Sequence, residues 1–128
     1  MPPRRRIDPA RGRAALETCR TTSDPDRDAV ATAVRWVLQE LSEIAPGGAT
    51  EVRVPPFGVV QCLAGPRHTR GTPPNVVQTD AATLLELAVG TITWDTALAT
   101  GRVLAGGTRA DLSEYLPLAP PPVAGRSG

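Results

Sequence analysis

The chain has no lysine, because all 14 of its basic residues are arginine. It therefore offers no amine for a Schiff base and no lysine for a phosphate-binding loop. One histidine and two cysteines in 128 residues leave no zinc site of the usual ligand spacing. The cysteines, Cys19 and Cys62, lie far apart in the sequence, and we expect both to be free thiols.

Aromatic residues are also scarce, with two tryptophans, one tyrosine and one phenylalanine. The core must therefore be aliphatic, and there is no stacking platform for single-stranded nucleic acid. A net charge of +1 gives no global field that would attract nucleic acid or an anionic membrane. No apolar run approaches the ~20 residues that span a bilayer, and no hydrophobic segment follows the basic residues 1–6. We expect a cytoplasmic protein with no nucleic-acid partner and no stable membrane insertion.

The length and composition predict one domain. We expect it to cover residues 7–118, between a disordered basic tip over residues 1–6 and a disordered tail over residues 119–128. The tail is rich in proline, glycine and alanine, which bury too little apolar surface to offset the entropy of ordering.

Two helices are expected in the first third of the chain. Asp8-Pro9 is a helix-start signal, and the helix should run to about Cys19. Asp24-Pro25 repeats the signal, and the second helix should run to about Ala45. The apolar residues of the second helix recur on one stripe, formed by Val30, Val34, Val37, Leu38, Leu41 and Ile44.

The remainder of the chain alternates between strand and helix signals. The expected strands cover 49–55, 57–63, 75–78 and 102–105, and the expected helices cover 80–90, 93–100 and 108–116. The strand at 57–63 is more apolar than the one before it, so we expect it to lie nearer the centre of the sheet. This order predicts an α+β fold, with helices packed on one face of a mostly antiparallel sheet.

The segment 65–77 holds the only histidine of the chain, His68, between Arg67 and Arg70. Glycine and proline shape the backbone around these three residues, and Asn75 follows them. Such a loop between two strands is suited to a carboxylate or phosphate, because arginine binds these groups through paired hydrogen bonds. The alternative is a purely structural loop, whose arginines are solvated or pair with carboxylates of a neighbouring helix.

The order of short motifs resembles a known family. The motifs are Arg53-Val54-Pro55-Pro56-Phe57-Gly58, Gln61-Cys62, the 65–77 loop, Leu84-Leu85-x-Leu87-Ala88-x-Gly90, Trp94-x-x-Ala97, Gly101-Arg102-Val103, Gly106-Gly107 and Leu116-Pro117-Leu118. Over about residues 7–118 they resemble sterol carrier protein-2-like domains, in particular the short stand-alone actinobacterial proteins called sterol carrier family proteins. The layout is also similar to the C-terminal domain of mycothiol-dependent maleylpyruvate isomerases.

This resemblance implies a roughly five-stranded, mostly antiparallel sheet covered by helices, with an apolar cavity between the layers. It implies a non-enzymatic carrier for an apolar, anionic small molecule such as a lipid, fatty acid, acyl-CoA or sterol-like compound, with no cofactor, metal or catalytic residue. Arg67, His68 and Arg70 would hold the polar end of the ligand, with Asn75 orienting it. The residues that would line or border the cavity are Leu63, Val77, Leu84, Leu87, Trp94, Leu98 and Leu104. Taken singly, each of these is better explained as ordinary core.

Two other hypotheses are kept. The domain could instead be an accessory module that acts with a separate enzyme subunit or other protein partner, or as a homodimer. It could also be an enzyme that uses His68 with Cys62, six positions apart, although a catalytic cysteine needs an electropositive, partly open setting. The sequence contains no serine-hydrolase, zinc-protease, phosphate-loop or dinucleotide motif.

Overall fold

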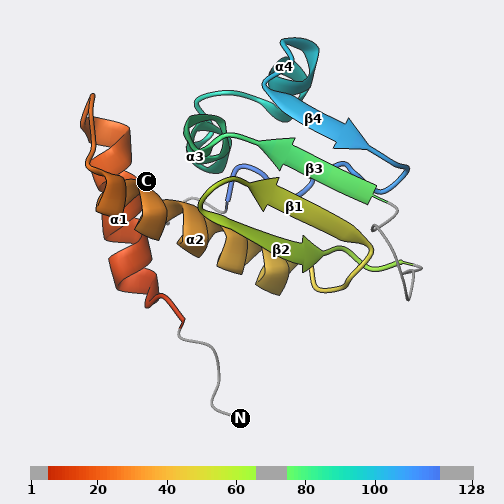
Figure 1. Ribbon diagram of the computed structural model, residues 1–128, viewed down its shortest axis with the longest axis horizontal. Coiled ribbons are helices and arrows are strands. Elements are labelled where there is room, and N and C mark those ends of the chain that lie inside the picture. The colour runs from red at the N-terminus through yellow and green to blue at the C-terminus, as the bar shows by residue number, and fades with distance from the viewer. Residues whose placement is uncertain (1–5, 66–74, 119–128) are drawn as a thin grey trace, which may run out of the picture.

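A computed structural model describes residues 6–65 and 75–118 as an α+β fold. Figure 1 shows the arrangement of its elements. In chain order they are α1 (Pro9–Thr21), α2 (Arg27–Ile44), β1 (Thr50–Val54), β2 (Gly58–Cys62), β3 (Asn75–Thr79), α3 (Ala81–Val89), α4 (Trp94–Ala99) and β4 (Val103–Gly106). None of the helices in these residues is long and apolar enough to cross a membrane.

The sheet differs from the one that was expected. In the described residues it has four strands rather than five, in the order β2-β1-β3-β4, and it is mixed. The outer pairs β1–β2 and β3–β4 are antiparallel, whereas the central pair β1–β3 is parallel. The connection between β1 and β2 is short enough for a hairpin, but no local pattern indicates that β3 then pairs with the far side of β1. That pairing depends on contacts distant along the chain.

Strand β2 lies at the edge of the sheet and not near its centre. Its apolar composition is misleading, because Val59 is 54% exposed. The central strands β1 and β3 instead show strict alternation between buried and half-buried residues. Val52 and Val54 face the core as their alternation predicted, and Val77 does so from β3.

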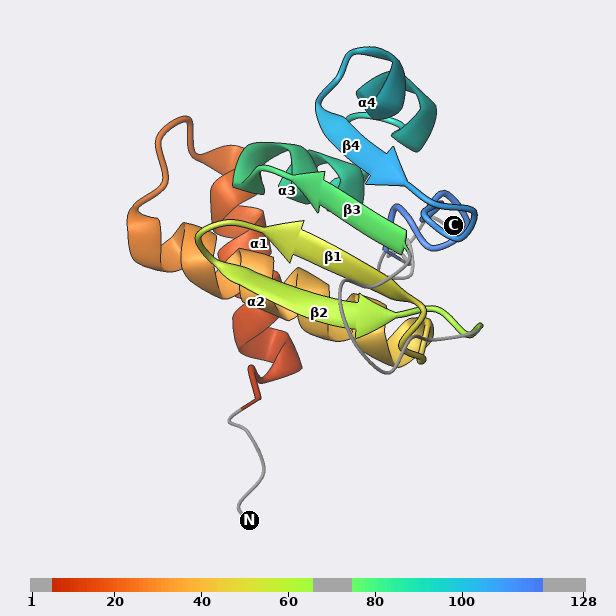
Figure 2. The ribbon, with the colours of Figure 1, turned by 45° about the vertical axis from the view of Figure 1, so that its right-hand side comes forward.

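The buried face of the sheet packs against α2, α3 and residues 107–118, while α1 packs against α2. Figure 2 shows the helices α1, α2 and α3 behind the sheet, so that the opposite face of the sheet has no helix over it in the described residues. The core is aliphatic apart from Trp36 and Trp94.

Side-chain caps set the starts of the helices. Asp8, Asp26, Asp80 and Thr93 each accept a hydrogen bond from a backbone N–H in the first turn of the helix that follows. The second helix is therefore capped by Asp26 and not by Asp24, since the carboxylate of Asp26 reaches the N–H of Ala29 at 2.8 Å. The other three helix starts agree with the expected positions.

The segment 108–116 is not the helix that its pattern predicted. It contains two turns, at residues 108–109 and 113–115, and in the second the N–H of Tyr115 bonds to the carbonyl of Leu112 at 2.9 Å. Both backbone groups of Arg109 are taken up by the sheet: its N–H donates to Asn75 Oδ1 at 3.0 Å and its carbonyl accepts from Thr50 Oγ1 at 2.6 Å. These bonds tie the segment to the sheet, and Leu112 is buried without a helix.

We expect truncation of the buried face of α2 to destabilise the protein. Val37 and Leu41 are fully buried, so replacing either with Ala should lower the free energy of unfolding by about 2–4 kcal/mol. Ile44 is a matched control on the same helix, because it is 45% exposed and its replacement with Ala should cost less than about 1 kcal/mol. Chemical denaturation measures all three values. An unchanged midpoint for both core variants would contradict this packing of α2.

Candidate functional site

A groove of about 610 Å³ lies between α1, the start of α2 and α3. The helices that form its walls are labelled in Figure 1. Its volume is within the ~300–1,000 Å³ typical of sites for small molecules. The apolar residues of the lining are Leu16, Cys19, Pro25, Val30, Ala81, Ala82, Leu85 and Val89. This groove is the candidate site.

Helix α3 supplies much of the lining because it is apolar on two sides. Leu84 and Leu87 are buried in the core. Ala81, Leu85 and Val89 are spaced four apart and form a second face that lines the groove, although Leu85 is also mostly buried. This second apolar face is the sequence signal that would have indicated the groove.

Helix α1 forms the opposite wall, and α2 holds it in place. A Cβ atom at Gly12 would lie 2.2 Å from Cγ of Trp36, so only glycine allows α1 to pack this closely on α2. Before the helix, the N–H of Ile7 donates to Gln39 Oε1 and its carbonyl accepts from Gln39 Nε2, both at 3.0 Å. These contacts position the C-terminal half of α1, which carries Leu16 and Cys19, across from α3.

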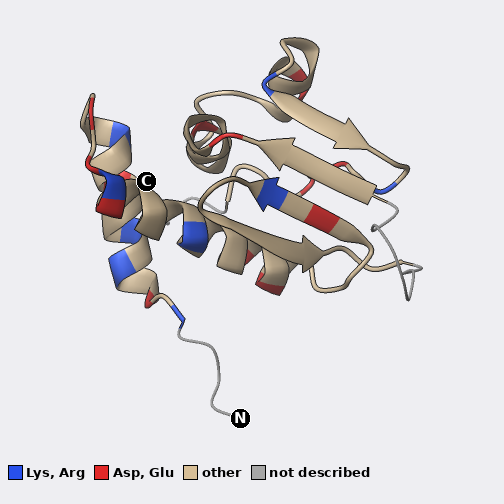
Figure 3. Cartoon of the chain, in the orientation of Figure 1, with Lys and Arg blue, Asp and Glu red and all other residues tan. Residues whose placement is uncertain are grey.

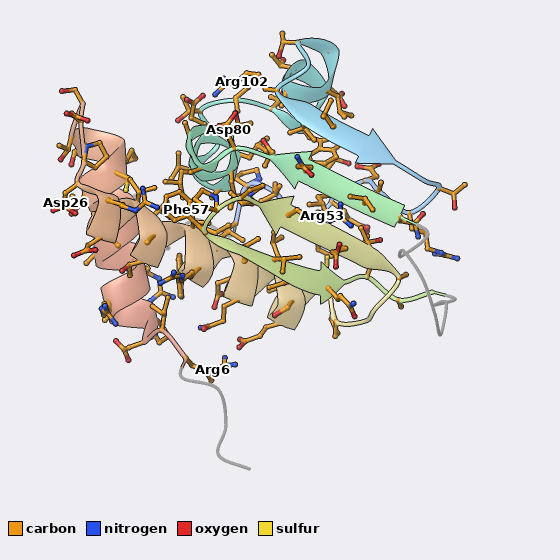
Figure 4. All side chains as sticks on the ribbon, viewed as in Figure 1. Arg6, Asp26, Arg53, Phe57, Asp80 and Arg102 are labelled. Atoms are coloured by element: carbon orange, nitrogen blue, oxygen red, sulfur yellow. The ribbon has the colours of Figure 1, made fainter. Side chains whose placement is uncertain are left out.

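Two of the three charged side chains that line the groove, Arg20 and Glu86, are paired, and the third is Asp24. Arg20 donates to Glu17 at 3.0 Å, and the Arg20 guanidinium lowers the pKa of the Glu17 carboxyl. Glu86 accepts from Arg102 at 3.1 Å, and the hydrogen bond to Glu86 raises the pKa of Arg102. Asp80 contributes to that rise, and Figure 4 shows it near Arg102. The rim therefore presents two ion pairs and the carboxylate of Asp24 around an apolar floor.

Neither thiol is set up as a nucleophile. Cys19 lies in the wall of the groove, and burial, followed by the charge of Asp26, raises its pKa. Cys62 is fully buried, and burial raises its pKa to about 11. Both thiols are therefore largely neutral at pH 7. Among residues 6–65 and 75–118, no three His, Cys, Asp or Glu side chains gather as they would around a metal ion.

The residues proposed from the sequence to border a cavity are distributed over several places. Val77, Leu84, Leu87 and Trp94 are core residues, and the last two also border a separate hollow of about 240 Å³. Leu98 and Leu104 are 38% and 63% exposed, and they border a hollow of about 540 Å³ on the helix-free side of the sheet. Leu63 is half-buried and has a φ of 69°, which is unusual for a residue with a side chain. None of these seven residues lines the groove between α1 and α3.

Of the polar site residues proposed from the sequence, only one lies in the part of the chain that the structure describes. Arg67, His68 and Arg70 lie outside the residues that the structure describes. Asn75 is buried, and its amide joins three segments, since Nδ2 donates to the carbonyl of Ala49 at 2.7 Å and Oδ1 accepts from Arg109 N–H at 3.0 Å. Both ends of this amide are thus engaged within the protein.

A comparison with protein families supplies the class of the protein. The family model for bacterial SCP orthologs matches residues 26–118. The chain belongs to this family, as the resemblance noted in its motifs predicted. A comparison with curated proteins finds no match. The matched region begins at Asp26, the N-cap of α2, so α1 and its wall of the groove precede it.

We expect the two cysteines to differ in reactivity. In native protein Cys19 should react slowly with a disulfide reagent such as DTNB, and Cys62 should react only after unfolding. The reactive form is the thiolate, and the pKa of Cys19 is raised, so its rate should still be increasing at pH 9. If Cys19→Ala abolishes the reaction of native protein with DTNB, the reacting residue is Cys19. Equal native rates for the two thiols would contradict their placement.

Proposed function

We propose that this protein is a non-enzymatic carrier that binds an apolar small molecule in the groove between α1 and α3. Membership of the bacterial SCP orthologs favours a lipid- or sterol-carrier type of binding. The observation that carries the proposal is the groove itself, which has a volume of about 610 Å³ and an apolar lining from three helices. Candidate ligands are a lipid, a fatty acid, an acyl-CoA or a sterol-like molecule.

Binding is favoured over catalysis by the chemistry of the groove. Two of its three charged rim groups, Arg20 and Glu86, already have partners, which leaves them poorly placed to donate or accept a proton during a reaction. Its one thiol, Cys19, has a raised pKa and so is a weak nucleophile at pH 7. An apolar floor with mostly paired charges at its rim can hold a ligand without transforming it.

The direct test is to identify what the protein carries. Native protein from its own host would be extracted with organic solvent, and the extract analysed by mass spectrometry. We expect an apolar compound in molar proportion to the protein, released when the protein unfolds. A protein that is empty, and that also fails to bind long-chain fatty acids, alcohols and sterols in solution, would contradict the proposal.

A bulky side chain placed in the groove should prevent binding there. Ala82 lines the groove and is exposed, so Ala82→Trp should lower affinity for a fluorescent long-chain probe by about tenfold or more while the fold survives. Ala99→Trp is the matched control, because Ala99 is also an exposed helical alanine but lies on α4. Its affinity should stay within about twofold of wild type. Equal affinities for both variants would place the ligand elsewhere.

The anionic end of the ligand is proposed from the sequence alone. Arg67, His68 and Arg70 would bind a carboxylate or phosphate, because charge-assisted bonds are about twice as strong as neutral ones. Arg70→Ala should therefore weaken binding of a fatty acid but not of its methyl ester in calorimetric titrations. Affinity for the acid should also increase as pH falls through about 6.5, where an ordinary histidine becomes charged.

The control for this experiment is Arg11→Ala, which removes an exposed arginine of α1. It should change neither titration. If Arg70→Ala lowers stability and leaves both ligands bound equally well, the loop is structural. That result would remove the anion preference without affecting the proposal that the groove binds apolar molecules.

A further inference from the structure

The face of the sheet opposite α2 and α3 is an unusual surface. Figure 2 shows it turned toward the viewer, with no helix of the described residues over it. We call it the open face. Its side chains come from alternate positions of the four strands, and they are Glu51, Arg53, Val59, Gln61, Val76, Gln78 and Leu104, with Gly106 at the end of β4. Figure 3 shows charge on one strand only, β1.

Exposed apolar side chains are concentrated on this face. The large apolar residues that are well exposed in the described part of the chain are Ile44, Val59, Leu98 and Leu104. Two of these, Val59 at 54% and Leu104 at 63%, belong to the open face, and Leu98 of α4 borders the same hollow as Leu104. Exposed apolar groups that gather on one face are typical of a contact surface.

Strand register aligns four of these side chains in one row. Val59 is opposite Arg53, Arg53 is opposite Gln78, and Gln78 is opposite Leu104. The row thus runs across the whole sheet from β2 to β4, with an apolar residue at each outer strand and a polar residue at each inner strand. From either edge of the sheet, the row therefore has the same order: apolar, polar, polar, apolar.

We propose that the open face binds a second copy of this chain. A two-fold axis parallel to the strands, between β1 and β3, would bring the two open faces together with their strands nearly aligned. Val59 would then face Leu104 of the second copy, and this contact would occur twice. Arg53 would face Gln78 of the second copy.

The charges on the face allow it to meet itself. Arg53 and Glu51 form an ion pair on the same strand, with side chains that are 38% and 19% exposed. Because the pair is neutral as a whole, two copies do not repel each other when they approach. A face with unbalanced charge would instead favour a partner of the opposite sign.

The dimensions of the face predict weak association. Four strands about 4.8 Å apart, each four or five residues long at about 3.3 Å per residue, give a flat area of roughly 300 Å². Stable complexes bury about 800 Å² on each partner. We therefore expect a concentration-dependent dimer with a dissociation constant of about 0.1 mM.

Sedimentation velocity from about 10 μM to 1 mM tests the proposal. The average mass of the wild type should rise from 13.4 kDa toward twice that value. Val59→Glu and Leu104→Arg should each keep the protein monomeric, and circular dichroism would verify that both fold. Ile44→Arg is the matched control, because Ile44 is an exposed apolar residue on α2, away from the open face. It should dimerise like the wild type.

Mixing experiments test which residues meet. In a mixture of the Val59→Glu and Leu104→Arg proteins, a mixed dimer would place the two new charges opposite each other at one of the two contacts. The other contact would keep its native Val59 and Leu104, so the dimer should reappear. A mixture of Val59→Glu with Val59→Arg should stay monomeric, because the two-fold axis places residue 59 of each copy on opposite sides of the interface. A wild type that is monomeric at 1 mM would overturn the proposal. So would an equal effect of Ile44→Arg, or dimer recovery in the second mixture.

Discussion

Helix α2 is packed on two opposite sides, and the rest of the structure depends on this arrangement. Trp36 and Leu38 are two residues apart, which places them about 200° apart around a helix. Trp36 contacts Gly12 of α1, whereas Leu38 lies close enough to Gly58 of β2 that a Cβ there would be 3.1 Å from it. Both neighbours approach α2 closely because they have no side chain. The helix thus fixes the sheet on one side and α1 on the other.

The proposed ligand groove follows from the contact between α1 and Trp36 of α2. Helix α1 precedes the region that matches the bacterial SCP orthologs, yet it supplies Leu16 and Cys19 to the lining. Its position is set by the Gly12–Trp36 contact and by the two hydrogen bonds between Ile7 and Gln39. Without α1, the outer face of α3 would be an exposed apolar strip. The groove is therefore a consequence of how α1 docks on a domain of this family.

The two proposed binding surfaces lie on different layers of the molecule. The groove is formed by helices, whereas the open face is formed by strands and bordered by α4. A ligand in the groove and a second copy on the open face would not compete for the same residues. Leu98 and Leu104, which the sequence suggested as cavity residues, are explained on this view by protein contact.

The sequence by itself determined the local structure. Asp8, Asp80 and Thr93 cap their helices through bonds to residues two or three positions away, and Gly90 ends α3 with a φ of 87°, so these boundaries were predictable. The motif order likewise predicted the family. Tertiary structure alone decided the parallel pairing of β1 with β3, the edge position of β2 and the non-helical segment around Arg109. Arg109 is held by Asn75 and Thr50, which lie 34 and 59 positions away, and no local pattern encodes bonds of that span. Tertiary structure also decided the groove, because its apolar lining comes mainly from three helices that meet only when the chain is folded.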